Sequence, residues 1–125
     1  MKRIIAAILL IFISVGGSIL VSVNVQKKSD IMIDLMKNDR EIIISSKATD
    51  FNRTQKIEEQ WKGMEDFMAA FLPHSEIDAV EIGIKCLVDY NNQGLTDEYL
   101  ETLNECINTL NHVKETEKIY FKNIF

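Results

Sequence analysis

The chain has 125 residues, with 14 Lys and Arg residues against 19 Asp and Glu residues, so its formal net charge is −5. Lys2 and Arg3 precede an uncharged apolar run, and the chain beyond that run holds 12 basic and 19 acidic residues, a net charge of −7. This acidic excess argues against a nucleic-acid partner, because binding to a phosphate backbone depends on basic contacts. One Pro in the whole chain and three Gly after the apolar run favour long helices over a strand-rich fold.

The apolar run extends over twenty residues, from Ile4 to Val23, and contains no charged side chain. At about 1.5 Å per residue it spans roughly 30 Å, the thickness of a bilayer's hydrocarbon core. We therefore expect residues 1–24 to form a transmembrane anchor that contacts the lipid bilayer through residues 4–23. The alternative is a cleavable signal peptide, for which Val15-Gly16-Gly17 would supply the small residues of a cleavage site.

The orientation of this anchor follows from the charges on its two sides. Lys2, Arg3 and the amino terminus precede the run, whereas Lys27 and Lys28 follow it and are partly offset by Asp30. Basic residues prefer the cytoplasmic side of a membrane. We therefore expect a single-pass protein of the cell membrane with its amino terminus inside and residues 24–125 outside, and the reversed topology is the main alternative.

The remaining residues, 25–125, read as one helical domain of four segments. The first continues from the anchor to about residue 46, and a break follows between Ala48 and Thr54. A second helix runs to about Leu72, where Pro73 ends it. A third helix begins near Ser75 and ends at Gly94, which suits a left-handed cap. A fourth helix begins at Thr96.

Apolar residues recur at helical spacing in each segment and predict the faces that pack together. In the first segment the expected stripe is Ile31, Leu35, Asn38, Ile42 and Ser45. The core is expected to be built from Trp61, Met64, Met68, Phe71, Leu87, Leu103, Ile107 and Leu110. An alternative for the methionine-rich group around Trp61 is a ligand pocket. The predicted fold is all-α, with an N-terminal transmembrane helix followed by an antiparallel up-and-down four-helix bundle.

The short turn at Gly94 fixes a register between the third and fourth helices. In this register Cys86 lies level with Thr102. Its Cα atom is therefore offset from that of Cys106 by four residues, or about 6 Å, along the helix axis alone. A disulfide needs Cα atoms within roughly 4.4–6.8 Å and suitable side-chain directions. We therefore expect Cys86 and Cys106 to be free, buried thiols.

The same register places His112 opposite Glu76 and within about one turn of His74. With Asp78 nearby, a metal site of histidine and carboxylate ligands is conceivable. The competing interpretation is that these histidines cap a helix or bond a neighbouring carboxylate, because no metal-binding spacing such as HExxH is present. We therefore expect no metal and no cofactor, with His74, His112 and Asp78 as the candidate ligands if one binds.

The C-terminal segment is unusually apolar for a chain end. It either docks on the bundle or presents a partner surface made by Tyr120, Phe121, Ile124 and Phe125. Neither cysteine has a histidine at its predicted level, and no serine lies in a glycine-flanked nucleophile motif. The sequence therefore gives no sign of an enzyme and predicts no catalytic residue.

Taken together, several segments resemble a family of short, single-pass membrane proteins of unknown function from bacteria, chiefly Gram-positive spore formers. The resemblance covers most of the chain and rests on the basic start with its apolar anchor, Trp61, Pro73-His74 with Glu76-Ile77-Asp78, Leu110-Asn111-His112-Val113 and Asn123-Ile124-Phe125. It implies a location and an architecture but no reaction. It also implies that His74, His112 and the last three residues share a role.

Two functions from different classes fit these expectations. The first is a membrane-anchored extracytoplasmic interaction or structural module that displays its bundle to another membrane or envelope protein. The alternative is a sensor-like ligand-binding bundle that acts through a membrane partner, because only three residues precede the apolar run and cannot carry an output domain.

Overall fold

The computed structural model describes residues 1–124, except the side chains of Tyr120, Phe121, Asn123 and Ile124. Within this part the chain is all-α, with four helices and no strand, as the sequence predicted. The helices are α1 (Lys2–Ser46), α2 (Phe51–Phe71), α3 (His74–Gln93) and α4 (Thr96–Ile124). The expected anchor and the first segment of the bundle are therefore one uninterrupted helix of 45 residues.

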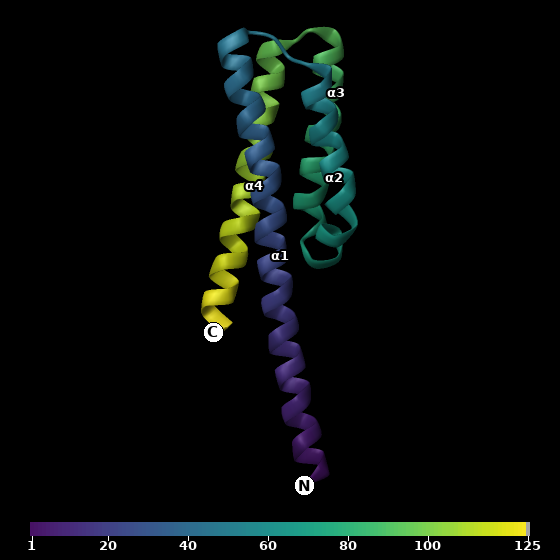
Figure 1. Cartoon of the computed structure of the whole chain (residues 1–125), viewed down its shortest axis with the longest axis vertical. Coiled ribbons are helices and arrows are strands. Elements are labelled where there is room, and N and C mark those ends of the chain that lie inside the picture. Colours follow the sequence, from purple (N-terminus) through teal and green to yellow (C-terminus); the bar gives the residue numbers. More distant parts are fainter. Residues whose placement is uncertain (125) are drawn as a thin grey trace.

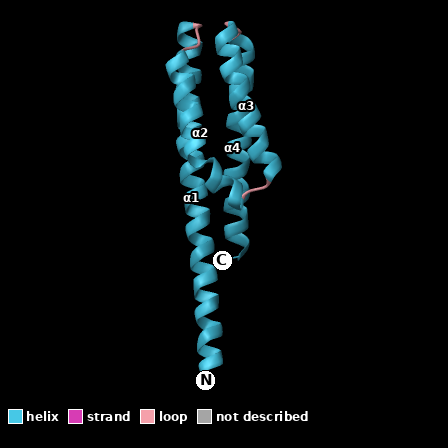
Figure 2. Cartoon of the chain, turned by 90° about the vertical axis from the view of Figure 1, so that its right-hand side faces the viewer, coloured by secondary structure: helices cyan, strands magenta, loops and turns pink. Residues whose placement is uncertain are grey.

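The four helices pack in a ring, in which α1 contacts α2 and α4, and α3 contacts α2 and α4. Figure 1 shows the chain turning between α1 and α2 at one end, between α2 and α3 near the middle of α1, and between α3 and α4 at the first end again. Short connections join all of them, as Figure 2 shows. The N-terminal half of α1 projects alone beyond this bundle.

The turns are formed by residues whose backbone preferences end a helix. Gly94 has φ of 70° and caps α3 in the left-handed conformation, as its position after Asn91-Asn92-Gln93 predicted. Lys47 adopts the same conformation at the end of α1, with φ of 58°, and its N–H bonds the carbonyl oxygen of Ile43. Pro73 separates α2 from α3, because its ring excludes helical geometry from the preceding Leu72.

The predicted stripe of α1 is wrong by about one position. Ile31 is 46% exposed, and Asn38 and Ser45 are also exposed. Ile33 is buried beside Met32, and the other seven buried positions recur at spacings of three and four residues: Ser22, Val25, Ser29, Met32, Met36, Asp39 and Ile43. Three of these seven are polar, so apolar residues mark this face only weakly, and the predicted stripe followed the neighbouring face, which lies about 100° around the helix.

Seven of the eight predicted core residues are buried: Trp61, Met64, Met68, Leu87, Leu103, Ile107 and Leu110. The eighth prediction is wrong, because Phe71 is 51% exposed. Phe71 and Leu72 lie three and four residues after the buried Met68, so both continue the stripe at helical spacing. Leu72 takes the buried position at this end instead, with 8% exposure.

Gly63 and Gly83 both lie inside helices, but their surroundings differ. A Cβ atom added at Gly83 would collide with the Cys106 sulfur, whereas one added at Gly63 would meet nothing within 4 Å. Gly83 therefore allows the close approach of α3 to α4, while Gly63 only weakens α2, since glycine costs a helix about 1 kcal/mol relative to alanine.

This contrast gives a matched pair of variants. We expect Gly63→Ala to raise the free energy of unfolding by about 0.5–1 kcal/mol through helix propensity. Gly83→Ala should lower it by about 1 kcal/mol or more, because overpacking outweighs that gain. Urea unfolding of both variants, followed by circular dichroism, measures the difference. Adding Cys106→Ala to Gly83→Ala should recover stability, and equal stabilisation by both single variants would contradict the close approach.

Candidate functional site

A cluster of buried polar side chains joins α1, α2 and α4 in the half of the bundle farther from the N-terminus. The Asp39 carboxylate is 1% exposed, and its Oδ1 atom accepts a hydrogen bond from Arg53 Nε at 2.8 Å. The Tyr99 hydroxyl donates to Asp39 Oδ2 at 2.5 Å and lies 2.8 Å from Thr54 Oγ1. Both carboxylate oxygens thus have partners, as a buried charge requires.

The surroundings of this cluster favour a structural role over a chemical one. Tyr99 is fully buried, and its pKa is raised well above the ordinary tyrosine value, first by desolvation and then by its hydrogen bond to Asp39. The phenol therefore stays protonated and serves as a fixed donor. Because the cluster spans three helices, it holds their relative positions rather than presenting a reactive group to solvent.

Sequence reasoning missed Asp39, Thr54 and Tyr99 because it treated polar residues as surface residues. One signal for Asp39 was present: it continues the three-and-four spacing of Met32, Met36 and Ile43. An acidic residue at a core position predicts a basic or hydroxyl partner on a facing helix.

We expect Tyr99→Phe to lower the free energy of unfolding by about 1–3 kcal/mol, because a buried carboxylate oxygen loses its donor. The raised pKa also predicts a pH dependence. Tyrosine in the unfolded chain titrates near pH 10. The difference in free energy of unfolding between the wild type and Tyr99→Phe should therefore be complete below about pH 10 and should shrink as pH rises toward the folded-state pKa of Tyr99. Urea unfolding across this range measures the effect.

Tyr90→Phe is the control for this prediction. Tyr90 is half-buried against the core, and its hydroxyl makes no hydrogen bond among the described residues. This variant should change stability by less than about 0.5 kcal/mol. A Tyr99→Phe protein as stable as the wild type at neutral pH would show that the hydroxyl does not support Asp39.

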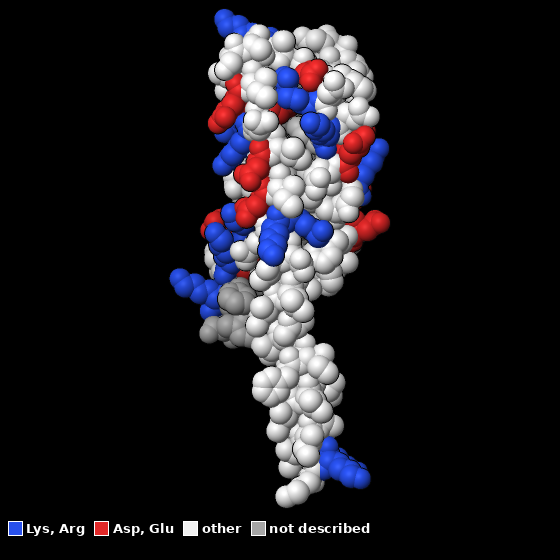
Figure 3. Space-filling model, in the orientation of Figure 1, with Lys and Arg blue, Asp and Glu red and all other residues white. Residues whose placement is uncertain are grey.

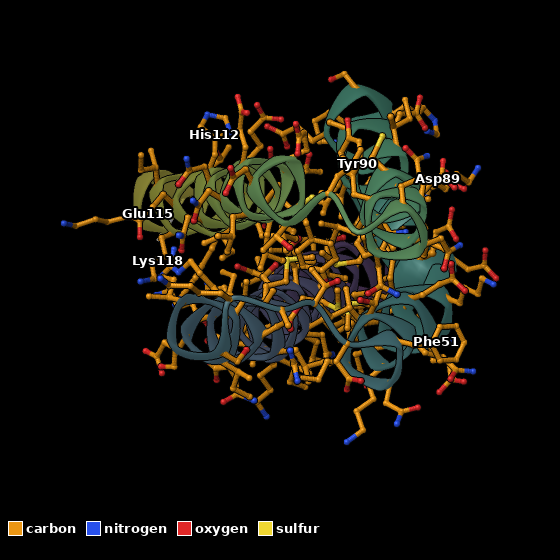
Figure 4. All side chains as sticks on the ribbon, turned by 90° about the horizontal axis from the view of Figure 1, so that it is seen from above. Phe51, Asp89, Tyr90, His112, Glu115 and Lys118 are labelled. Atoms are coloured by element: carbon orange, nitrogen blue, oxygen red, sulfur yellow. The ribbon has the colours of Figure 1, made fainter. Side chains whose placement is uncertain are left out.

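The predicted meeting of His112 with Glu76 occurs in the structure. His112 Nδ1 lies 2.8 Å from Glu76 Oε1 and ties α4 to α3, although the His112 side chain is 70% exposed. Figure 4 shows His112 on the side of α4 that faces away from α1. Ser75, Ala79, Asn108 and Thr109 complete a shallow surface hollow around the pair. Desolvation, and secondarily the charge of Glu76, raises the pKa of nearby Glu117.

The other candidate metal ligands do not join this pair. His74 lies at the first position of α3, and both His74 and Asp78 are exposed. Among residues 1–124, no three His, Cys, Asp or Glu side chains come together as metal ligands would. The arrangement around His112 can bond a carboxylate or an external acceptor, and it supplies no metal cage.

Both cysteines are free in the structure. Cys106 is buried, and burial raises its thiol pKa to about 12, so little of the reactive thiolate forms near neutral pH. Cys86 is only half-buried, so the predicted burial holds for Cys106 and not for Cys86. The contact between Cys106 and Gly83 places Cys106 about three residues, or roughly 4.5 Å of rise, from the level of Cys86. Neither thiol has a histidine partner among the hydrogen bonds of the described residues.

The predicted C-terminal partner surface lies outside the described side chains, because Tyr120, Phe121 and Ile124 are described only as helix backbone and Phe125 not at all. Ile119, which precedes them, is 59% exposed.

The model of one protein family matches residues 20–124 of the chain, and that family is described as "Domain of unknown function (DUF4363)". No curated protein and no solved structure matches the chain. The matched region begins at Leu20, two residues before Ser22, the first buried residue of α1. It therefore coincides with the part of the chain that forms the bundle.

Proposed function

The chain belongs to the DUF4363 family, and from its geometry we propose that it is a membrane-anchored helical bundle that interacts with another membrane or envelope protein. In this proposal residues 4–23 cross the cell membrane once. The amino terminus lies inside, and residues 24–125 form an antiparallel up-and-down bundle outside. No residue is assigned a catalytic role.

The observation that carries the anchoring proposal is the division of α1 into two environments. An 18-residue window of α1 has a mean hydropathy of 2.8, and none of it is buried. Every large apolar side chain from Ile4 to Ile13 is 47–71% exposed. A core helix would bury such residues in the protein, so the bilayer is the environment that fits them.

The continuity of α1 favours an anchor over a cleaved signal. The helix runs without a break from the exposed apolar half to Ser22, Val25 and the rest of the buried stripe. Cleavage near Gly17 would leave the apolar residues Leu20 and Val23, which are 65% and 43% exposed, on a free helix end. Retaining the whole helix keeps these side chains in lipid.

An interaction role is supported by the end of the bundle farthest from the N-terminus. Three large apolar side chains are exposed there: Ile44 at 62%, Phe51 at 58% and Leu95 at 37%. A hollow beside Ile44 lies between the end of α1 and the start of α4, and Lys47, Thr96 and Asp97 border it. Apolar groups rimmed by polar ones are typical of protein-binding surfaces.

A ligand-sensing role is the second candidate, and the hollow around Glu76 and His112 is the observation that favours it. This hollow is shallow and open to solvent, whereas small-molecule sites usually enclose most of their ligand. The interaction role therefore accounts for more of the exposed surface.

The anchoring proposal predicts that the full chain stays in the membrane pellet after alkaline carbonate extraction of cell membranes. Protease added to intact cells should remove residues 24–125, because they lie outside. Immunoblotting with a tag at the C-terminus measures both results. Release by carbonate would contradict the anchor, and protection from protease in intact cells combined with cleavage in lysed cells would reverse the topology.

The interaction proposal predicts a site-specific crosslink. A photo-reactive amino acid at Ile44 should trap one membrane or envelope protein in intact cells, identified by mass spectrometry. The matched control is Ile82, which is 61% exposed in the middle of α3. Ile82 should trap no such partner, because it lies away from the proposed surface. Equal capture from both positions, or no product from Ile44, would count against an interaction surface at this end.

A further inference from the structure

Two polar contacts set the register between α1 and α4. Arg40 donates to Asn104 Oδ1 at 2.9 Å, and Lys114 pairs with Asp30 at 2.6 Å. From the first pair to the second, the chain position falls by ten residues on α1 and rises by ten residues on α4. Moving eight residues further in the same direction brings Lys122 level with Ser22, and Lys118 falls level with Gln26.

A groove between the two helices shows this adjacency directly, because it is lined by Ser22, Val23, Gln26, Lys118 and Lys122. In Figure 4, Lys118 lies on the side of α4 that is toward α1. Ser22 and Val23 are the last residues of the uncharged run. The fold therefore returns two lysines of α4 to the point where α1 leaves the proposed membrane span.

From this placement we infer that the groove binds the phosphate of an anionic phospholipid headgroup in the bilayer that α1 spans, an inference that rests on the proposed anchoring. A lipid phosphate lies just outside the hydrocarbon region, at the depth of Ser22 and Lys122 in this arrangement. Free phosphate would have the same chemistry, but nothing would hold it at this depth.

The groups in the groove match a phosphate. Lys118 has only a weak surface contact with Glu115, at 3.7 Å, and Lys122 makes no ion pair among the described residues. Lys114 differs, because Asp30 already neutralises it. The Ser22 hydroxyl accepts from Gln26 Nε2 at 3.4 Å, which leaves its own hydrogen for an anionic oxygen.

The charge of the whole bundle is divided in a way that supports this ligand. Residues 24–30 and 114–124 carry five lysines and three acidic residues, whereas residues 31–113 carry seven basic and 16 acidic residues. Figure 3 shows basic side chains gathered where the bundle meets the uncharged part of α1. In the proposed arrangement the end with an excess of basic residues faces the lipid headgroups and the acidic remainder is held away from them, which favours an anionic lipid at this end.

The exposed Phe71 fits the same boundary. Lys28 Nζ lies 5.1 Å from the centre of the Phe67 ring, and the Phe67 and Phe71 ring centres are 5.1 Å apart. Phe71 therefore lies one turn beyond Phe67, in the direction of the anchor. Phenylalanine is one of the side chains that peripheral helices bury at the boundary between lipid headgroups and acyl chains, which accounts for an exposed phenylalanine at the end of α2.

The test is lipid selectivity of the full chain in vesicles of phosphatidylcholine. Electron spin resonance compares the association of spin-labelled phosphatidylglycerol with that of spin-labelled phosphatidylcholine. We expect the wild type to prefer phosphatidylglycerol. The double variant Lys118→Gln/Lys122→Gln should reduce this preference by about fivefold or more, because one lysine near an anionic lipid contributes a factor of about five. Raising the salt concentration should also weaken it.

Lys62→Gln/Lys85→Gln is the matched control, because both lysines are exposed and sit in weak pairs with Glu58 and Glu81 on α2 and α3. This variant removes the same charge and should leave the preference unchanged. An equal loss in both double variants, or no loss in the first, overturns the inference. Loss of the preference on adding inorganic phosphate, but not chloride of equal ionic strength, would show a free-anion site and also overturn it.

The outcome is distinguishable from a failure of the anchoring proposal. Resistance of the reconstituted chain to carbonate extraction reports the anchor alone. A resistant chain without lipid preference refutes the headgroup site and keeps the anchor, whereas an extractable chain refutes both. Circular dichroism of each variant shows that its helices are retained.

Discussion

The continuity of α1 is the constraint on which the other features depend. One helix of 45 residues serves two environments, with its first half exposed and apolar and its second half packed in the bundle. Because no turn separates the halves, the bundle cannot reorient freely about the exposed half of α1. The register of α2 and α4 against α1 then sets how close each helix of the bundle comes to the exposed half. This is why the end of α4 meets Ser22 and why Phe71 comes toward the same boundary.

Apolar packing alone does not determine that register. The buried positions of α1 recur every three or four residues, so a shift of seven residues would bring a similar face against α4. Such a shift would separate Asp39 from Arg53 and Tyr99 and leave a charge buried without partners. It would also break the contacts of Arg40 with Asn104 and of Lys114 with Asp30. The polar contacts therefore select one alignment among several that the apolar face permits.

The sequence predicted local features well, because their causes are local. Gly94 and Pro73 end helices by their own backbone geometry, and the short turn at Gly94 fixes the facing of α3 and α4 closely enough to bring His112 to Glu76. The register of α1 was beyond such reasoning, since no short turn joins α1 to α4. The Asp39 cluster was missed for a different reason: polar residues at core positions look like surface residues until their partners are known. Phe71 was misplaced because spacings of three and four residues from Met68 both continue the stripe, and Leu72 takes the buried position.

The lysines near the proposed anchor bear on the proposed topology as well as on the proposed lipid site. If residues 4–23 cross the membrane as proposed, α4 places Lys118 and Lys122 on the side of the span that also holds Lys27 and Lys28, so that side holds more basic residues than Lys2 and Arg3 supply on the other. The preference of basic residues for the cytoplasm acts through short flanking loops, however, and large domains are translocated largely regardless of their charge. Lys118 and Lys122 are distant from the anchor in sequence and approach it only after folding. In the proposed topology their position therefore bears on lipid contacts of the folded protein and not on the choice of orientation during insertion.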